Sequence, residues 1–249
     1  MKLTDIFRKT PRELKEPVDF GVLHTDLHSH LIPGIDDGSK SMEESIALIR
    51  ELYSMGYRKL ITTPHIMADY YRNTPEIIQS GLDELRAEMQ RQQIDMEIEA
   101  AAEYMIDDGF MDKVEAGNLL TFGNKFLLVE LSYIEEHPNL QGIFFEVQTR
   151  GYQIILAHPE RYRYWHRHFN KYRELNERNI FLQMNINSLT GWYSVESKRI
   201  AERLLSENLI SFLGSDLHNE HYLQELKKSR YLPVLKEVIS SSKILNSRL

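Results

Sequence analysis

The chain has 249 residues, with 30 basic and 37 acidic side chains, a formal net charge of −7, ten histidines and no cysteine. Its length and its 42% hydrophobic content suit one large globular domain and exclude disordered, collagen-like and coiled-coil chains. The absence of cysteine excludes disulfides, thiolate metal sites and cysteine nucleophiles, and the acidic balance argues against a general nucleic-acid or anionic-membrane surface.

The first twenty residues are polar and charged. We therefore expect residues 1–20 to form an extension ahead of a single domain over residues 21–249. The N-terminus has no apolar stretch long enough for a signal peptide, and no run of about 18 apolar residues follows it. We expect a cytoplasmic protein with no membrane insertion.

Short apolar runs then alternate with segments of helical periodicity. The runs predicted as strands are residues 21–27, 59–63, 96–103, 126–131, 152–157, 180–186 and 209–214. Helices are predicted from Ser41, where Ser41 and Glu44 form a capping box, and over residues 75–92, 139–150 and 195–208. Strands separated by helices predict a parallel α/β domain.

Side chains that can bind metal follow nearly every predicted strand. They are His28, His30, Asp36, His65, Glu103, Glu130, His158, Asp216 and His218. The sixth strand is the exception, since residues 183–187 carry amides instead. A β/α barrel is favoured over an open sheet, because its strand ends converge on one face and would bring these side chains together.

The number and type of these donors indicate more than one metal ion. One ion needs about four to six donors, and carboxylates can bridge neighbouring ions in hydrolytic sites. The mixed imidazole and carboxylate set suits manganese, iron or zinc. Burying these groups without partners would cost free energy, so a metal site explains their placement better than a core does.

The motifs, taken in order, resemble a known family. Asp26-Leu27-His28-Ser29-His30, Thr63-Pro64-His65, Glu103, His158-Pro159-Glu160-Arg161 and Ser215-Asp216-Leu217-His218 resemble the PHP (polymerase and histidinol phosphatase) superfamily. The loop over residues 32–38 and the helix after it are similar to one branch, the CpsB/CapC type of bacterial tyrosine-protein phosphatases linked to capsular and exopolysaccharide synthesis. The resemblance covers about residues 22–219 and implies a distorted seven-stranded β/α barrel of the PHP type.

The resemblance also implies three divalent metal ions, with manganese favoured and iron or zinc as alternatives. The implied ligand sets are His28, His30, Glu103 and Asp216 for the first ion, Glu103, Glu130 and His158 for the second, and Asp36, His65 and His218 for the third. Histidinol phosphatases of the superfamily often carry histidine at the positions of Asp36 and Glu130. The carboxylates here favour the tyrosine-phosphatase branch.

Arg161, Asp36 and His218 are the implied catalytic residues. Arg161 matches a family arginine that binds phosphate, while Asp36, His65 or His218 would position an acid or a water near the third ion. Relatives can carry a second arginine soon after the Asp-x-His motif, but this chain has Asn219-Glu220-His221-Tyr222 there. The candidates to replace that arginine are Arg163, Arg167 and Lys171.

The implied function is a metal-dependent protein-tyrosine phosphatase whose nucleophile is a metal-activated water. Its implied substrate is the tyrosine-rich tail of a polysaccharide-synthesis kinase. Candidates for the rim of the site are residues 70–72 and 162–165, which could equally be loop anchors. The alternatives are a histidinol-phosphate or other small-molecule phosphomonoesterase, and a PHP binding module with an inactive site. The sequence has no basic stripe that would favour a nucleic-acid-processing enzyme.

Overall fold

The computed structural model describes residues 13–241 and 243–249. Most of the expected N-terminal extension, residues 1–12, lies outside the described residues. The part that is described packs on the rest of the chain, since Phe20 is buried and Leu14 N and Val18 N donate to the carbonyl oxygens of Tyr231 and Arg230. The boundary at residue 21 stays a prediction. No helix among the described residues is long and apolar enough to cross a membrane.

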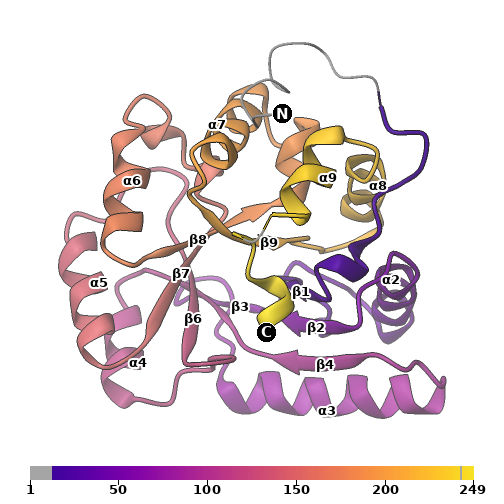
Figure 1. Cartoon of the computed structure of the whole chain (residues 1–249). Coiled ribbons are helices and arrows are strands. Elements are labelled where there is room, and N and C mark those ends of the chain that lie inside the picture. Colours follow the sequence, from indigo (N-terminus) through magenta and orange to yellow (C-terminus); the bar gives the residue numbers. More distant parts are fainter. Residues whose placement is uncertain (1–12, 242) are drawn as a thin grey trace.

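The strands are parallel and alternate with helices (Figure 1). One sheet has the order β1 (Thr25–Leu27), β2 (Lys59–Thr62), β4 (Glu97–Ala100). The other has the order β3 (His65–Ile66), β5 (Glu103–Met105), β6 (Phe126–Glu130), β7 (Gln153–Ala157), β8 (Phe181–Asn185), β9 (Ile210–Gly214). Because β2 continues into β3 and β4 into β5 after two residues, these strands correspond to the seven predicted strand regions. The expected α/β class is confirmed.

The first and last strands of this series are neighbours. Asp216 N donates to His28 O at 2.8 Å, and His30 N donates to Leu217 O at 2.9 Å. The hydroxyl and amide of Ser215 donate to the Asp26 carboxylate at 2.7 and 2.9 Å. The carboxyl end of β9 therefore lies beside that of β1, although residues 26 and 216 are far apart in the sequence.

Helices lie around the strands in Figure 1. They are α2 (Met42–Ser54), α3 (Pro75–Arg91), α4 (Phe110–Ala116), α5 (Leu140–Thr149), α6 (Asn170–Glu177), α7 (Val195–Ser206), α8 (Glu220–Ser229) and α9 (Pro233–Ile239). Short 3₁₀ turns are η1 (Phe20–Val22), η2 (Pro159–Arg161), η3 (Arg163–Trp165), η4 (Ile186–Thr190) and η5 (Asn246–Arg248). The predicted start of α2 is confirmed, because Ser41 Oγ accepts from Glu44 N at 3.3 Å.

Apolar side chains form two clusters, one large and one small. The larger contains residues from both helices and strands, such as Leu48 of α2 and Leu60 of β2. The smaller consists mainly of strand residues and includes Leu27, Leu128 and Phe212. These packed layers hold the strands rigidly, so the polar side chains at the strand ends have fixed positions.

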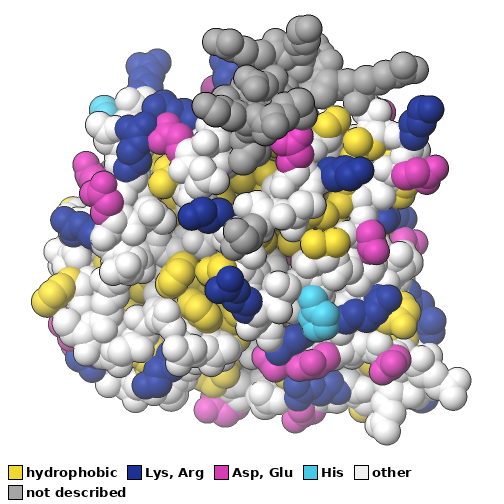
Figure 2. Space-filling view, viewed as in Figure 1, with side chains coloured by type: hydrophobic (Ala, Val, Ile, Leu, Met, Phe, Trp, Pro, Cys, Tyr) yellow, Lys and Arg dark blue, Asp and Glu magenta, His cyan; other side chains and the backbone are white. Residues whose placement is uncertain are grey.

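The surface carries both charges. On the face seen in Figure 2, basic and acidic side chains are interspersed over the described part of the chain. That face shows no extended basic stripe, in agreement with the acidic composition.

Candidate metal centre

Three of the expected ligands lie where the chain turns at the end of a strand. His28, His158 and Asp216 follow β1, β7 and β9, and their φ angles are 95°, 34° and 51°. A non-glycine residue with positive φ costs on the order of 1–2 kcal/mol, and such strain collects at functional sites. The turns direct these three side chains toward one another, and all three are buried.

Glu103, the first residue of β5, lies at the middle of the cluster and is fully buried. Its Oε2 is 3.1 Å from His28 Nε2 and 3.2 Å from His65 Nδ1. Its Oε1 is 3.0 Å from His158 Nε2. A carboxylate surrounded by imidazoles from three strands has the position expected of a bridge between metal ions.

The donor atoms fall into four overlapping groups whose members lie within 4.8 Å of one another. The groups are His28, His30 and Glu103; His28, His158 and Asp216; His65, Glu103 and Glu130; and His30, Asp37, His65 and His218. Every expected ligand except Asp36 belongs to at least one group. The groups overlap because four residues each belong to two of them: His28, His30, His65 and Glu103.

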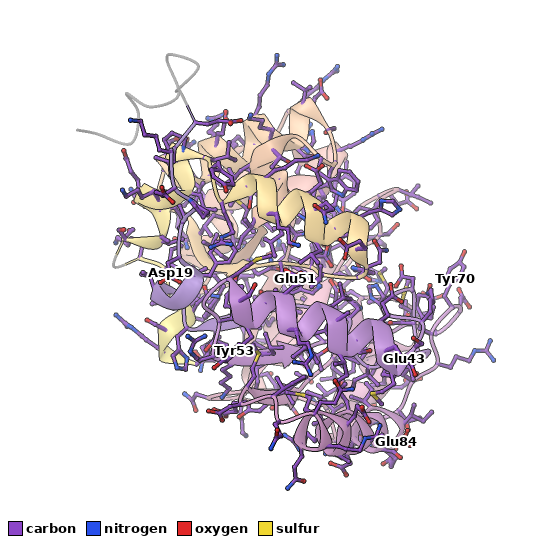
Figure 3. The ribbon with its side chains drawn as sticks, turned by 90° about the vertical axis from the view of Figure 1, so that its right-hand side faces the viewer. Asp19, Glu43, Glu51, Tyr53, Tyr70 and Glu84 are labelled. Atoms are coloured by element: carbon purple, nitrogen blue, oxygen red, sulfur yellow. The ribbon has the colours of Figure 1, made fainter. Side chains whose placement is uncertain are left out.

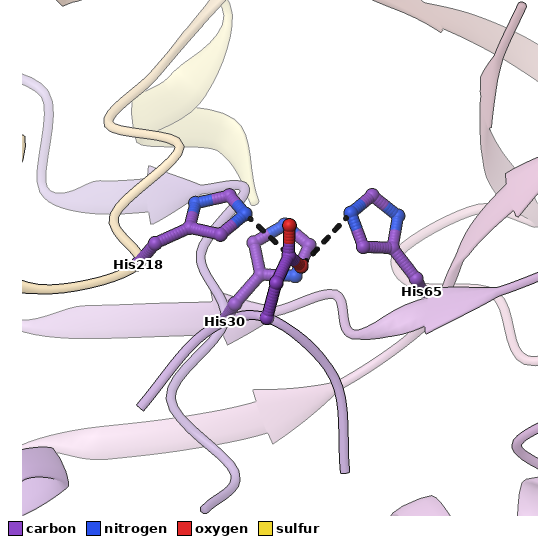
Figure 4. A group of neighbouring side chains, drawn as sticks. His30, His65 and His218 are labelled. Atoms are coloured by element: carbon purple, nitrogen blue, oxygen red, sulfur yellow. Dashed lines mark ion pairs between the residues drawn. The ribbon is translucent and has the colours of Figure 1, made fainter. Parts of the chain in front are cut away.

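The aspartate pair after the first strand is arranged differently from the expected ligand set, and the assignment of Asp36 to the third ion stays a prediction. The Asp36 carboxylate is held by His30 and by the backbone of β3: its Oδ2 lies 2.7 Å from His30 Nδ1 and accepts from His65 N at 3.1 Å. The adjacent Asp37 supplies the carboxylate of the group that contains His65 and His218, with Oδ1 3.5 Å from His65 Nε2 and 3.6 Å from His218 Nε2. Figure 4 shows His30, His65 and His218 converging there.

Several buried atoms of this centre have no hydrogen-bond partner among the described residues. They are His28 Nε2, His30 Nε2, His65 Nδ1 and Glu103 Oε2. An unsatisfied buried polar atom costs about 1–3 kcal/mol. Divalent cations would satisfy all four, because imidazole nitrogen and carboxylate oxygen are ligands for manganese, iron and zinc. The residues present therefore fit bound metal ions.

The carboxylates also change the proton affinity of the imidazoles. Burial opposes protonation of His65, but the negative charges of Glu103 and Glu130 raise its pKa to about 9. Burial likewise opposes protonation of His28, and Glu103 with Asp216 still raises its pKa above the usual value. Since a ligand imidazole must be neutral, protons and metal ions compete for these nitrogen atoms.

Amides of β8 connect two of the expected ligands. Gln183 Oε1 lies 2.9 Å from His28 Nδ1, and Gln183 Nε2 donates to Asn185 Oδ1 at 3.0 Å. Asn185 Nδ2 donates to Asp216 Oδ2 at 2.6 Å. A proton on His28 Nδ1 leaves Nε2 as the metal-binding atom, so this chain of bonds orients both ligands. The sequence feature that indicates this arrangement is the pair of amides in the sixth predicted strand, at the position where the other strands carry metal-binding side chains.

Arg161 lies beside the centre between two tyrosine rings. Its guanidinium carbon is 4.7 Å from the ring centre of Tyr133 and 4.2 Å from that of Tyr193. Its Nη1 donates to Asp216 Oδ2 at 3.2 Å, the one hydrogen bond of its side chain within the described residues. Most of its N–H donors therefore remain for an anion. Sequence reasoning missed Tyr133 and Tyr193.

Three tyrosine rings, which we call the aromatic collar, lie against three of the histidines. Tyr71 stacks on His65 with 5.5 Å between ring centres, Tyr133 on His158 with 5.8 Å, and Tyr222 lies 4.9 Å from His218. Tyr133 has 42% of its surface exposed, so the collar borders solvent as well as the centre. Only Tyr71 belongs to the expected rim.

The other rim candidates divide into surface and core residues. Tyr70 is 78% exposed and lies at the same end of the molecule as Glu43, near the start of α2 (Figure 3). Tyr162 and Trp165 are buried, and the Tyr162 hydroxyl donates to Ala157 O and accepts from Leu131 N. Tyr162 and Trp165 therefore anchor their loop, which is the alternative role predicted for residues 162–165.

The sequence and fold are similar to those of known phosphatases. The family model described as "Capsular polysaccharide synthesis, CpsB/CapC" matches residues 24–232. Tyrosine-protein phosphatase YwqE of Bacillus subtilis is 29% identical over 195 residues, which cover 78% of this chain and 77% of the relative. Tyrosine-protein phosphatase CpsB of Streptococcus agalactiae is 27% identical over 200 residues, 78% of this chain and 82% of the relative.

Solved structures show the same fold. A chain from the crystal structures of YwqE from Bacillus subtilis and CpsB from Streptococcus pneumoniae, described as unique metal-dependent tyrosine phosphatases, has a TM-score of 0.78 at 28% identity, over 88% of this chain and 89% of that one. A histidinol phosphate phosphatase from Lactococcus lactis was solved with zinc, L-histidinol and phosphate. It has a TM-score of 0.53 at 15% identity, and the match covers 87% of this chain and 94% of that one. The second likeness concerns the fold alone.

Proposed function

The chain belongs to the CpsB/CapC family of capsular polysaccharide synthesis, and from this membership we propose that it is a metal-dependent protein-tyrosine phosphatase. The relatives named above are tyrosine-protein phosphatases, and the related crystal structures are described as metal-dependent. The buried imidazole and carboxylate groups support the same activity, because phosphate-monoester hydrolysis requires strong stabilisation of negative charge. We propose that the centre binds three divalent ions and that manganese is the preferred metal.

The aromatic collar is the observation that carries the choice of substrate. Its three tyrosine rings surround the histidines, so an aryl group that enters with its phosphate directed at the centre meets aromatic surface. A non-aromatic phosphomonoester would gain little from such a rim. Histidinol phosphate also carries an aromatic ring, and between the two we favour phosphotyrosine because the relatives named above are tyrosine-protein phosphatases.

Metal ions bound at the centre would lower the pKa of a bound water toward neutrality and offset charge on the phosphoryl oxygens. The chain itself supplies Arg161, whose planar guanidinium is held between Tyr133 and Tyr193 and can donate to two phosphoryl oxygens at once. Asp216 fixes one end of this guanidinium through Nη1. Because the chain has no cysteine, the reaction does not use a thiolate nucleophile.

Asp36 is poorly suited to the role of general acid. Burial opposes its ionisation, but the charge and the hydrogen bond of His30 lower its pKa below the usual value. It therefore stays ionised and acts by positioning His30. His218, whose Nε2 faces Asp37, remains the proposed residue for holding water near the leaving group.

We propose that the substrate is a tyrosine-phosphorylated protein of polysaccharide synthesis. The phosphotyrosines would lie in the tail of a tyrosine kinase, and the reaction would take place in the cytoplasm. The family description supports the pathway. The site is compatible with a flexible tail, because Tyr133 and Tyr70 at its rim are exposed.

The test compares substrates and metals. Purified protein is freed of metal, supplied with manganese, iron or zinc, and assayed on a phosphotyrosine peptide, the matched phosphoserine peptide and histidinol phosphate. We expect metal-dependent turnover of the phosphotyrosine peptide and loss of that turnover on chelation. Faster turnover of histidinol phosphate would establish the alternative substrate class, and full activity after exhaustive chelation would refute metal dependence.

Two variants with a matched control complete the test. His28→Ala and Asp216→Ala each remove a donor from the centre, so we expect at least a 100-fold loss of kcat/KM, on the order seen when a group that stabilises the transition state is removed. His168→Ala changes an exposed histidine and should keep wild-type activity. Circular dichroism of all three variants separates a lost site from a lost fold.

A further inference from the structure

A cavity of about 300 Å³ lies beside Arg161. Its lining residues are Tyr133, Arg161, Arg163, Tyr193, Ser194 and Ser197. None of the expected metal ligands lines it. The cavity therefore adjoins the metal centre through Arg161, which would also contact the reacting phosphoryl group, and extends from there to Arg163, Ser194 and Ser197.

The charged side chains of this cavity are both arginines. Arg161 makes one ion pair, with Asp216, and Arg163 makes none within the described residues. Such a concentration of positive charge stands out in a chain whose net charge is −7. Two guanidinium groups that line one small cavity and keep most of their N–H donors free are typical of sites for carboxylate or phosphate.

The start of α7 supplies the neutral donors of the cavity. Ser197 is buried, and its hydroxyl accepts from Ser194 Oγ at 2.9 Å. No acceptor for the Ser197 hydroxyl hydrogen occurs among the described residues, so this hydrogen is available to a ligand. Ser194 Oγ already accepts from Ser197 N at 2.9 Å, which fixes both side chains at the helix end.

Arg163 also stands apart from the other candidates for the missing second arginine. Arg167 and Lys171 line a different cavity, and Lys171 is paired with Glu136. Arg163 alone of the three shares a cavity with Arg161. The two arginines lie two positions apart, on either side of the buried Tyr162, so their backbones are fixed relative to each other.

We propose that this cavity is a second anion subsite, which binds an acidic group of the phosphotyrosine substrate while the phosphoryl group lies at the metal centre. The bound group is a carboxylate of a neighbouring Asp or Glu, or the phosphate of a second phosphotyrosine. Arg163 and Ser197 bind it, and Arg161 lies between the two anions. This inference rests on the proposed phosphatase function and names the substrate feature that the enzyme selects.

The experiment measures kcat and KM on three peptides that differ near one phosphotyrosine: a neutral peptide with Asn, an acidic peptide with Asp, and a peptide with a second phosphotyrosine. We expect the wild-type protein to show a KM about 5- to 10-fold lower on the two anionic peptides, with kcat unchanged. Arg163→Met should remove this preference by raising KM on the anionic peptides. If only one anionic peptide benefits, the bound group is identified as carboxylate or phosphate.

Arg199→Met is the matched control, because it removes an exposed arginine of α7 that does not line the cavity. It should keep the wild-type preference, which separates the subsite from a general loss of positive charge. Equal KM on all three peptides, or a preference that survives Arg163→Met, would overturn the subsite alone. Absence of turnover on every peptide would instead overturn the proposed function, and the subsite with it.

Discussion

Two neighbouring aspartates of the first loop contribute differently to the centre. Asp36 binds His30 Nδ1 and two backbone amides, those of Gly38 and His65, whereas Asp37 faces His65 and His218. A carboxylate that contacts one histidine and a carboxylate that faces several donor atoms have the same chemistry in the sequence. Only the direction of each carboxylate distinguishes them.

Replacing each aspartate by asparagine should separate the two roles. Asp37→Asn removes a charged donor from the group that contains His65 and His218, so we expect it to lower the metal content by about one ion per chain. Asp36→Asn keeps an acceptor for His30 and should keep the metal content while weakening activity by about 10- to 100-fold. Elemental analysis of both purified proteins measures the difference. The reverse pattern would restore Asp36 as the ligand.

The amides of β8 show that a residue need not touch a metal to determine its site. Gln183 fixes the tautomer of His28, and Asn185 holds Asp216. Both amides are fully buried, so each bond is formed away from water and has one geometry.

Gln183→Leu should weaken metal binding and activity by about 10- to 100-fold, because it removes the acceptor that orients His28. Gln183→Glu keeps an acceptor at this position and should recover part of the loss. The measurements are kcat/KM and the dissociation constant for manganese. Gln79→Leu, on the exposed face of α3, is the matched control. Wild-type metal affinity in Gln183→Leu would contradict the proposed role.

At the scale of elements, the close approach of β9 to β1 and β8 depends on Gly214. A Cβ atom added there would lie 2.3 Å from Leu27 O and 2.6 Å from Gln183 Nε2. Backbone atoms cannot move away as a flexible side chain can. Glycine at this position therefore lets Asp216, two residues later, reach the ligands that follow β1.

Gly214→Ala should lower the free energy of unfolding by about 1–3 kcal/mol, the usual effect of overpacking. It should also lower metal affinity, because it separates Asp216 from His28. Urea denaturation and metal titration test both effects. Gly109→Ala serves as the control, since its Cβ would meet only the end of the Lys113 side chain within 3.4 Å. Equal stability of Gly214→Ala and wild type would show that the strands can separate at no cost.

At the scale of the whole molecule, the centre joins strands from both ends of the chain. His28 and Asp216 are neighbours, as are Glu103 and His158, so no local segment forms the site. Metal ions held by these residues would together connect the ends of β1, β5, β7 and β9, and they would bind the folded chain far better than the unfolded one. Metal binding should be coupled to global stability.

Removing the metal should lower the melting temperature. At a metal concentration of about 100 times the dissociation constant, binding stabilises the folded chain by about 2.7 kcal/mol. For a chain of this size this corresponds to a shift of about 5–10 °C. The shift should shrink as the pH falls, because the pKa values of His28 and His65 are raised and protons then displace the metal. Differential scanning calorimetry with and without chelator measures it, and a pH-independent shift would contradict the competition.

Much of this molecule could be predicted from its sequence, because the relevant patterns are local. The capping box at Ser41 predicts the start of α2, and the apolar runs predict the parallel strands, since both depend on residues close together in the chain. Ligand types at the strand ends predict a metal centre for the same reason. The chemistry of a histidine or a carboxylate is present in its side chain before the chain folds.

The sequence by itself therefore determined the α/β class, the strand positions, the polar strand ends and the exclusion of thiolate chemistry. Only the tertiary structure decided which carboxylate faces the cluster, Asp37 or Asp36, and that the amides of β8 orient His28 and Asp216. It also decided that Arg163 shares a cavity with Arg161 and that tyrosines from two loops and from α8 form the collar. The reason is physical: these features depend on side-chain directions and on contacts between strands distant in sequence, which arise only when the strands pack.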